Sequence, residues 1–299
     1  MIVLPNPNWL TILTNLKGSI ARRIAKRCAM ITALAALIVL IESHHPEYFS
    51  KVSATPFTLL GLSLSIFMSF RNNACYARWW EGRQQWGKLV VEVRCFVRES
   101  IAITDKGRRE ALLRTLVGFT HALNARLRGE DEKAVARPWL SDTSAISDHN
   151  VADSLLSNIG QQCAQLASSG QINEWRYMLL EQRLVAFSEV QGACERIKAT
   201  PLPFPYSLLL HRTIYIFCLL LPFAMAQPLG WMAPIFTAIV SYTFFGLDAI
   251  GNELEDPFGR DVNDLPTDAM TRIVERDVLA ALGQKSLPPL LTPVEGVLS

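Results

Sequence analysis

Residues 55–70, TPFTLLGLSLSIFMSF, decide the fold of this chain. Read at intervals of four, this stretch places two rows of side chains next to each other, because each residue turns a helix by about 100°. The small row consists of Gly61, Ser65 and Ser69. The row beside it, called here the large apolar row, consists of Leu62, Ile66 and Phe70.

The small row predicts a face on which membrane helices pack closely, since small side chains let two backbones approach. Such packing turns the large apolar row toward whatever the helices surround. If several copies of the chain pack in this way, rings of apolar side chains line a narrow tube that holds water and ions poorly. Arg71, Asn72 and Asn73 follow directly, as expected where such a tube opens into a wet vestibule. The alternative is that the large apolar row faces lipid or fills the core of a single subunit.

Three further apolar runs cover residues 27–41, 207–227 and 229–250. A bilayer core about 30 Å thick needs roughly 20 apolar residues in a helix, so these runs and residues 55–70 predict four transmembrane helices. Little more than a Pro-Leu-Gly turn separates the last two, which therefore form a hairpin.

Positive charges set the orientation of the spans. Lys and Arg precede the first run and follow the second, whereas the connection between these runs holds only Lys51 and the hairpin turn holds no cation. Positive loops stay in the cytoplasm, so we expect both termini to be cytoplasmic. A cleaved signal peptide is the competing interpretation of the N-terminus. The length of the basic stretch and the second run close behind it favour a membrane span.

Between the second and third runs, residues 79–103 and 108–128 repeat apolar side chains at intervals of three and four, which predicts a helical cytosolic domain. The predicted organisation is a cytosolic N-terminal segment (1–24), transmembrane helices 1 and 2 (25–72), a helical cytosolic domain (73–206), transmembrane helices 3 and 4 (207–250), and a cytosolic C-terminal tail that packs on this domain (251–299). We expect a loop over residues 137–150 and a loosely held chain over the Pro-rich residues 286–299.

Composition limits the class of protein. Half of the residues are hydrophobic and 19% are charged, which indicates a membrane part joined to a substantial water-exposed part. The net charge of +2 argues against a nucleic-acid partner, which would require a concentration of cations. The six cysteines are scattered and no two lie at metal-ligand spacing, so we expect free thiols.

No motif indicates catalysis. Residues 82–88, GRQQWGK, match a phosphate-binding loop except that Leu89 follows in place of Ser or Thr, and they lie inside a helical pattern. His44 and His45 are adjacent and point apart, so they are not a metal site. We therefore expect no enzyme, no catalytic residue, no metal and no cofactor.

Four stretches carry a resemblance to a known family: KGSI at 17–20, FRNNACYARWWEGR at 70–83, ERIKATPLPFPY at 195–206 and ELEDPFGRDVNDLP at 253–266. In this order around four spans they resemble the bestrophins, in particular the bacterial branch. The most specific residues are Arg78, Trp79, Trp80, Pro257, Phe258 and Gly259.

The resemblance implies a homopentameric ring in the bacterial inner membrane with a single axial pore. Matching to the ARWW string places the membrane neck on Leu62, Ile66 and Phe70, so the row found by packing and the row carried from the family coincide. The family has a second constriction at the cytosolic exit, which the resemblance places on Phe187. A shift of three or four residues in the matching would place it on Leu184 or Val190 instead.

The resemblance also bears on the ion. Animal members resemble calcium-gated anion channels with an unbroken acidic run after the Pro-Phe-Gly motif. Here Arg260 and Val262 interrupt that run, so we expect no calcium gating. Bacterial relatives resemble channels for monovalent cations, which makes ions such as sodium the expected permeant species. The alternatives are a chloride or other anion channel of the same architecture, and a membrane-anchored scaffold or sensor that does not conduct.

Overall fold

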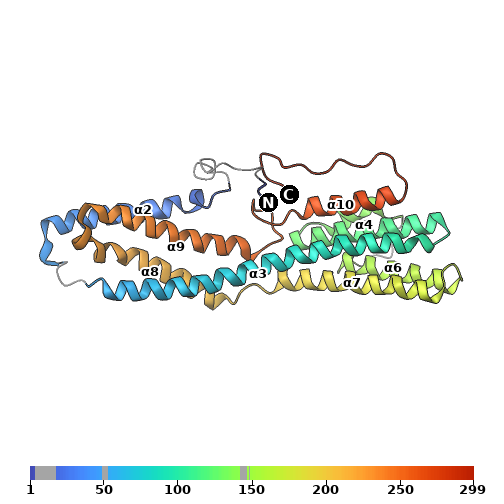
Figure 1. Ribbon diagram of the computed structural model, residues 1–299, viewed down its shortest axis with the longest axis horizontal. Helices are drawn as coiled ribbons and strands as arrows, with labels where there is room; N and C mark the ends of the chain where they lie inside the picture. Colours follow the sequence, from blue (N-terminus) through green and yellow to red (C-terminus); the bar gives the residue numbers. More distant parts are fainter. Residues whose placement is uncertain (4–17, 49–52, 142–146, 148) are drawn as a thin grey trace. The chain divides into compact units, whose positions relative to one another are not determined.

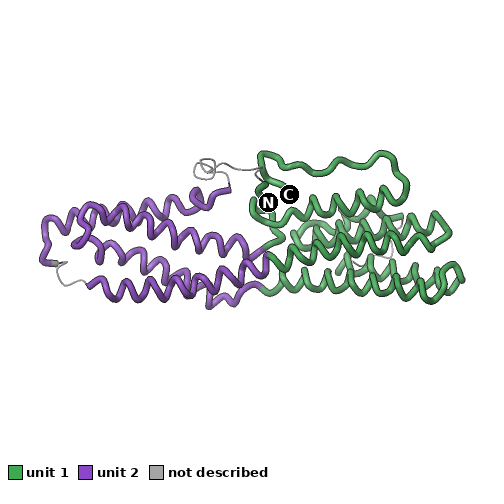
Figure 2. Tube along the Cα trace, viewed as in Figure 1, with its two compact units in different colours: residues 1–3, 80–200, 257–299 green, residues 4–79, 201–256 purple. Residues whose placement is uncertain are grey.

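The computed structural model describes residues 1–3, 18–48, 53–141, 147 and 149–299. These residues form helices and turns, and the only β-pairing among them consists of isolated bridges. The chain divides into two compact units (Figure 2). Unit 1 comprises residues 1–3, 80–200 and 257–299, and unit 2 comprises residues 4–79 and 201–256.

Unit 2 contains the apolar helices. They are α2 (Ala21–His44), the first part of α3 (Thr55–Glu99), α8 (Phe204–Leu229) and α9 (Ala233–Glu255), with the short 3-10 helices η1 (Pro46–Tyr48) and η4 (Gly230–Met232). Helices α2, α8 and α9 pack against one another and run side by side in Figure 1. The turn after α8 depends on Gly230, whose φ of 49° lies in the left-handed region that glycine tolerates. The predicted hairpin is therefore present.

The core of unit 2 joins all of these helices. Ile24 of α2, Leu64 of α3, Phe217 of α8 and Phe245 of α9 belong to one cluster of buried apolar side chains. By length and composition, two helical stretches among the described residues could cross a membrane: Ala21–His44 and Phe204–Glu255. They contain the first, third and fourth predicted spans. The second predicted span lies in α3, where the apolar sequence ends at Phe70, and its crossing of the bilayer stays a prediction.

Unit 1 is built around α4. Besides the remainder of α3 it contains η2 (Ser100–Ala102), α4 (Lys106–Arg128), α5 (Glu132–Ala136), η3 (Arg137–Trp139), α6 (Val151–Ser168), α7 (Glu174–Ala199) and α10 (Thr267–Ala281). Helix α4 packs against α5, α6 and α10. Side-chain caps begin several of these helices, as where Asp105 accepts from Arg108 N and Asn173 from Arg176 N.

The two ends of the chain meet within unit 1 (Figure 1). Val3 N donates to Gly296 O at 2.9 Å, Leu298 N donates to Met1 O at 2.8 Å, and Ala269 N donates to Ser299 O at 2.9 Å. Backbone pairing thus fixes the last residues of the chain. The expectation of a loosely held C-terminal end is wrong for these residues.

Helix α3 also departs from the predicted boundaries. It is a single helix from Thr55 to Glu99, whereas the sequence placed a division between domains at residue 72. Residues 82–88 lie within this helix, so they form no phosphate-binding loop, as expected. The six cysteines are unpaired.

Candidate pore-lining site

The large apolar row lies on an uncovered face of α3. Leu62 is 61% exposed, Ile66 48% and Phe70 62%. These side chains therefore do not fill the core of a single subunit, which removes one of the alternatives considered above. They are available to contact lipid, another copy of the chain, or a pore.

The small row serves more than one purpose. Gly61 faces α8 within the same subunit, because a Cβ at this position would lie 3.1 Å from Cζ of Phe217. Ser65 and Ser69 are exposed, and the Ser65 hydroxyl donates to Gly61 O at 2.8 Å. Only Gly61 therefore takes part in packing inside the subunit. Contact of Ser65 and Ser69 with a neighbouring subunit stays a prediction.

The opposite face of α3 is anchored in unit 2. Leu64 and Met68 belong to the apolar core, and Arg71 and Cys75 continue the same buried face one and two turns further on. Since successive residues differ by about 100° around a helix, fixing this face also fixes the direction of the large apolar row.

Arg71 is the charged member of this anchor. Its side chain is 1% exposed, and its Nη1 donates to Oδ1 of Asp248 on α9 at 2.9 Å. Nη2 donates to Oδ1 of Asn252, and Oε2 of Glu255 lies 3.9 Å from Nη2. A buried guanidinium needs such partners because removing its charge from water is costly. The expectation that Arg71 lies in a wet vestibule is wrong for the single chain.

Close packing surrounds this ion pair. Asn72 Nδ2 donates to Leu247 O at 3.0 Å. A Cβ on Gly251 would lie 2.6 Å from Asn72 Oδ1 and 3.1 Å from Arg71 Nη1, so a larger residue there would have to displace these side chains. Helices α3 and α9 therefore approach closely at the point where they exchange polar contacts.

Asp248 has a second partner. Its Oδ2 lies 3.0 Å from Nδ1 of His211 on α8, whose side chain is 42% exposed. The centre of the His211 ring lies 4.9 Å from the centre of the Tyr215 ring on the same helix. From α2, the guanidinium of Arg27 lies 5.8 Å from the centre of the Tyr215 ring. This row of polar and aromatic contacts joins all four helices of unit 2 near the end of the large apolar row.

The motif residues have structural roles within their own units. In unit 2, Arg78 Nε donates to Glu255 O at 3.2 Å. The Trp79 ring stacks on the Tyr76 ring, with 6.3 Å between the ring centroids. In unit 1, Trp80 is 47% exposed.

The Pro-Phe-Gly motif begins a loop in unit 1 that a backbone hydrogen bond closes. Leu265 N donates to Pro257 O at 2.9 Å, and Gly259 follows the buried Phe258. The Phe258 ring lies against Gly82, where a Cβ would be 3.1 Å from Cζ. A larger residue at position 82 would therefore require the Phe258 ring to shift.

The predicted aperture residue is not at an opening. Phe187 has no exposed surface and packs between Phe96 and Phe119, with ring centroids 5.9 and 6.0 Å away. Leu184 and Val190, the alternatives in the matching, are buried as well. A side chain that narrows a pore must reach its water, so the structure does not support any of the three.

The segment after the Pro-Phe-Gly motif is held by arginine. Arg260 Nε donates to Oε1 of Glu130 at 2.7 Å and its Nη1 lies 3.3 Å from Oδ2 of Asp268. The hydrogen bond that Arg260 donates to Glu130 raises the pKa of Arg260, burial opposes this effect, and the charge of Asp268 adds to it. In the described residues no group of three His, Cys, Asp or Glu side chains is placed to hold a metal ion.

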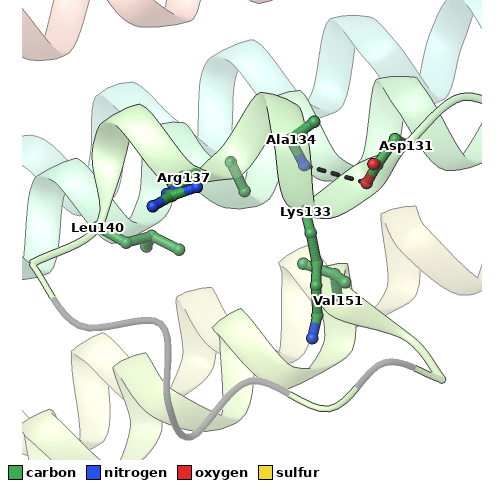
Figure 3. A pocket seen from close by; sticks show the side chains of 7 residues that line it. Asp131, Lys133, Ala134, Arg137, Leu140 and Val151 are labelled. Atoms are coloured by element: carbon green, nitrogen blue, oxygen red, sulfur yellow. Dashed lines mark hydrogen bonds between the residues drawn. The ribbon is translucent and has the colours of Figure 1, made fainter.

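A depression of about 460 Å³ lies in unit 1 beside α5 (Figure 3). Asp131 caps α5 there by accepting from Ala134 N at 3.0 Å, and Lys133 extends toward Val151. The lining combines one carboxylate with Lys133 and Arg137 and contains none of the predicted site residues.

Comparison with known proteins decides the family. Residues 1–280 match the family described as Bacterial/Fungal Bestrophin protein. The chain belongs to this family. This bestrophin is 40% identical over 298 residues to a voltage-dependent anion channel-forming protein of Mesorhizobium japonicum, with 99% of the chain and 96% of the relative covered. It is 34% identical over 297 residues to the voltage-dependent anion channel-forming protein YneE of Escherichia coli K12, with 98% of each covered.

Solved structures agree. A crystal structure of a bacterial bestrophin homologue from Klebsiella pneumoniae superposes with a TM-score of 0.84 at 34% identity, covering 88% of this chain and 100% of the other. The protein is thus an all-α membrane protein of the bestrophin fold, and the resemblance found in the sequence is confirmed. Its family and its named relatives point to a channel rather than an enzyme.

Proposed function

We propose that this bestrophin assembles as a homopentamer and conducts ions through a single axial pore whose neck is the large apolar row. In this proposal unit 2 lies in the bacterial inner membrane, unit 1 is cytosolic, and both termini are cytoplasmic. Head-to-tail contacts that close into a ring turn one lining helix per subunit into a complete pore.

One observation carries the proposal. Leu62, Ile66 and Phe70 are uncovered on a helix whose opposite face is fixed by core packing and by the buried pair of Arg71 and Asp248. A helix anchored on one side with large apolar side chains on the other is suited to forming rings around an axis. A ring of this kind gates by dewetting, because water is unstable in a narrow apolar tube.

The neck itself carries no charge. Beyond Phe70 the exposed face of α3 continues in unit 2 with Asn73, Tyr76 and Ala77, which are neutral. Arg71 is turned inward and paired with Asp248. The sign of the permeant ion is therefore set by charges away from the neck.

We propose monovalent cations such as sodium as the permeant ions, which rests on the resemblance to bacterial bestrophins. An anion channel of the same architecture is the second candidate, and the names of the relatives from Mesorhizobium and Escherichia favour it. Purified protein in a planar bilayer with a sodium chloride gradient separates the two. A reversal potential near the sodium equilibrium value supports the first, and one near the chloride value supports the second.

The neck assignment is tested by replacing its large side chains with alanine. Ile66→Ala and Phe70→Ala should each widen the neck and raise single-channel conductance several-fold, since both remove a large side chain from the narrowest ring. Ile239→Ala on α9 is the matched control, because Ile239 is 57% exposed and outside the large apolar row. Conductance that is unchanged in both neck variants would contradict the assignment. Reconstituted protein without any current would favour a scaffold or sensor.

Calcium independence is a separate proposal. Arg260 occupies Glu130 and Asp268 with hydrogen bonds, which removes carboxylate oxygens that a calcium ion would need. Flux measured with free calcium and with a chelator should be equal. A strong dependence on calcium would show that the interrupted acidic segment still binds it.

A further inference from the structure

Arg71, Asp248 and His211 form a chain of contacts from the neck helix to a partly exposed side chain. Arg71 follows Phe70 directly and is buried, while His211 is partly exposed. Asp248 stands between them, with Oδ1 bound by Arg71 Nη1 at 2.9 Å and Oδ2 at 3.0 Å from His211 Nδ1. One carboxylate is therefore shared between a guanidinium and an imidazole.

The geometry gives Arg71 control over Phe70. The guanidinium holds α3 against α9 by hydrogen bonds from its Nη atoms to the carboxylate and backbone carbonyl of Asp248 and to Asn252, whereas its Nε has no hydrogen-bond partner. If the hold on Asp248 weakens, the helix loses the main polar contact that fixes its rotation. Phe70 lies about 100° around the same helix and turns with it.

His211 is the imidazole in this chain of contacts. Histidine gains its proton between roughly pH 5 and 8, where arginine and aspartate keep their charges. A protonated His211 places a second cation against Asp248 and competes with Arg71 for it. Glu255 on α9 offers a second carboxylate to the released guanidinium, since its Oε2 lies 3.9 Å from Nη2 of Arg71.

The other charged and titratable groups around His211 are few. Tyr215 faces it on α8, and Arg27 reaches over the Tyr215 ring from α2. Arg212, the next residue on α8, is exposed. Among these groups only Asp248 is an anion in contact with His211, so the effect of its protonation falls first on the pair with Arg71.

We propose that Arg71 and Asp248 are positioning residues for the neck, and that protonation of His211 weakens their pair and lets Phe70 turn away from the axis. This inference rests on the proposed neck. It predicts that current through the wild-type protein rises as the pH falls from 8.0 to 5.5.

The test uses full-length protein in planar bilayers at both pH values. His211→Gln keeps a polar side chain without a titrating ring and should abolish the pH dependence. His44→Gln, at an exposed histidine on α2, should leave the pH dependence as in the wild type. Asp248→Asn should give the high-current state at both pH values, and Asp248→Glu should restore part of the wild-type profile.

Oligomer size by native mass spectrometry accompanies each variant, so that loss of assembly is seen directly. His211→Gln leaves the buried pair of Arg71 and Asp248 in place. It therefore keeps the inference testable if Asp248→Asn does not assemble. A pH profile in His211→Gln equal to that of the wild type overturns this inference and leaves the neck proposal standing if Phe70→Ala raises conductance. A wild-type protein that passes no current overturns both.

Discussion

At the scale of single residues, Arg71 and its partners on α9 hold the helix that carries the proposed neck. The large apolar row was found from its spacing, because the interval of four is a local property of the chain. Arg71 was assigned to a polar vestibule for the same local reason, since Asn72 and Asn73 follow it. Its partner Asp248 lies 177 positions later. No pattern within α3 indicates this pairing.

Gly251 offers a sharp test of the close approach between α3 and α9. Gly251→Ala should lower the stability by about 1–3 kcal/mol, because the new methyl group overlaps Asn72 and the guanidinium of Arg71. Gly246→Ala on the same helix is the control, since its Cβ would meet only Ile24 Cδ1 at 3.8 Å. Melting temperatures in detergent compare the two. Equal melting temperatures would show that the helices are not held this closely.

The pair of Arg128 and Asp268 predicts a pH dependence in unit 1. Burial disfavours the Asp268 carboxylate, but hydrogen bonds and charge from Arg128, with help from Asn124 and Arg260, outweigh it and lower the pKa of Asp268. A lowered folded-state pKa contributes stability that is present above the unfolded value of about 3.9 and is lost as the pH falls through the folded value.

Asp268→Asn should therefore cost roughly 2–4 kcal/mol at pH 7, because Arg128 is left buried and without its anionic partner. The difference from the wild type should shrink as the pH falls from about 4 through the lowered pKa of Asp268, below which the folded wild-type carboxyl is also neutral. Denaturant titrations at pH 7.0 and 3.0 measure this difference in the free energy of unfolding. Asp277→Asn removes a more exposed ion pair with Arg94 and should cost little at either pH.

At the scale of elements, apolar periodicity located the helices better than their ends. Both α2 and the hairpin of α8 and α9 were expected from long apolar runs, and α4 from its repeats of three and four. The end of α3 was missed because the change from apolar to charged composition at residue 71 was interpreted as the end of an element. A helix needs no break where its surroundings change, and residues 55–99 contain no internal proline after position 56.

The aperture assignment failed for a related reason. Helix α7 has apolar residues on its buried and exposed faces, and a shift of three or four residues along a helix stays on one face, so Phe187 and both alternatives in the matching are buried. Phe187 lies on the buried face with Phe96 and Phe119, whereas Met178 and Val185 are exposed. Burial, which the sequence alone does not supply, is needed to choose between them.

At the scale of the whole molecule, the proposed function depends on the number of copies. Native mass spectrometry of detergent-purified protein should give five times the 33.4 kDa of the chain. A neck formed by a face of one helix per subunit cannot exist in a monomer. A monomeric mass under conditions that preserve flux would therefore exclude an axial pore, and a ring of another size would change the diameter of the neck.

The family resemblance predicted more about the whole molecule than the physical patterns in the sequence did. Apolar runs and positive flanks indicated a membrane protein and its orientation. The family followed from specific motifs, such as Arg78-Trp79-Trp80 and Pro257-Phe258-Gly259, which the match over residues 1–280 confirms. The pairing of the chain ends in unit 1 left no signal in the sequence, because single backbone bonds between residues 1–3 and 296–298 require no particular side chains.

The long sequence separation between Arg71 and Asp248 has a consequence for biosynthesis. When the ribosome delivers residue 71 to the insertion machinery, the partner carboxylate has not been translated. At about 5–20 residues per second, the intervening 177 positions take on the order of 10–40 s. If α3 crosses the bilayer as predicted, the guanidinium must remain at the lipid headgroups or in the aqueous translocon during this delay. Final seating of the helix therefore awaits the last hydrophobic segment of the nascent chain.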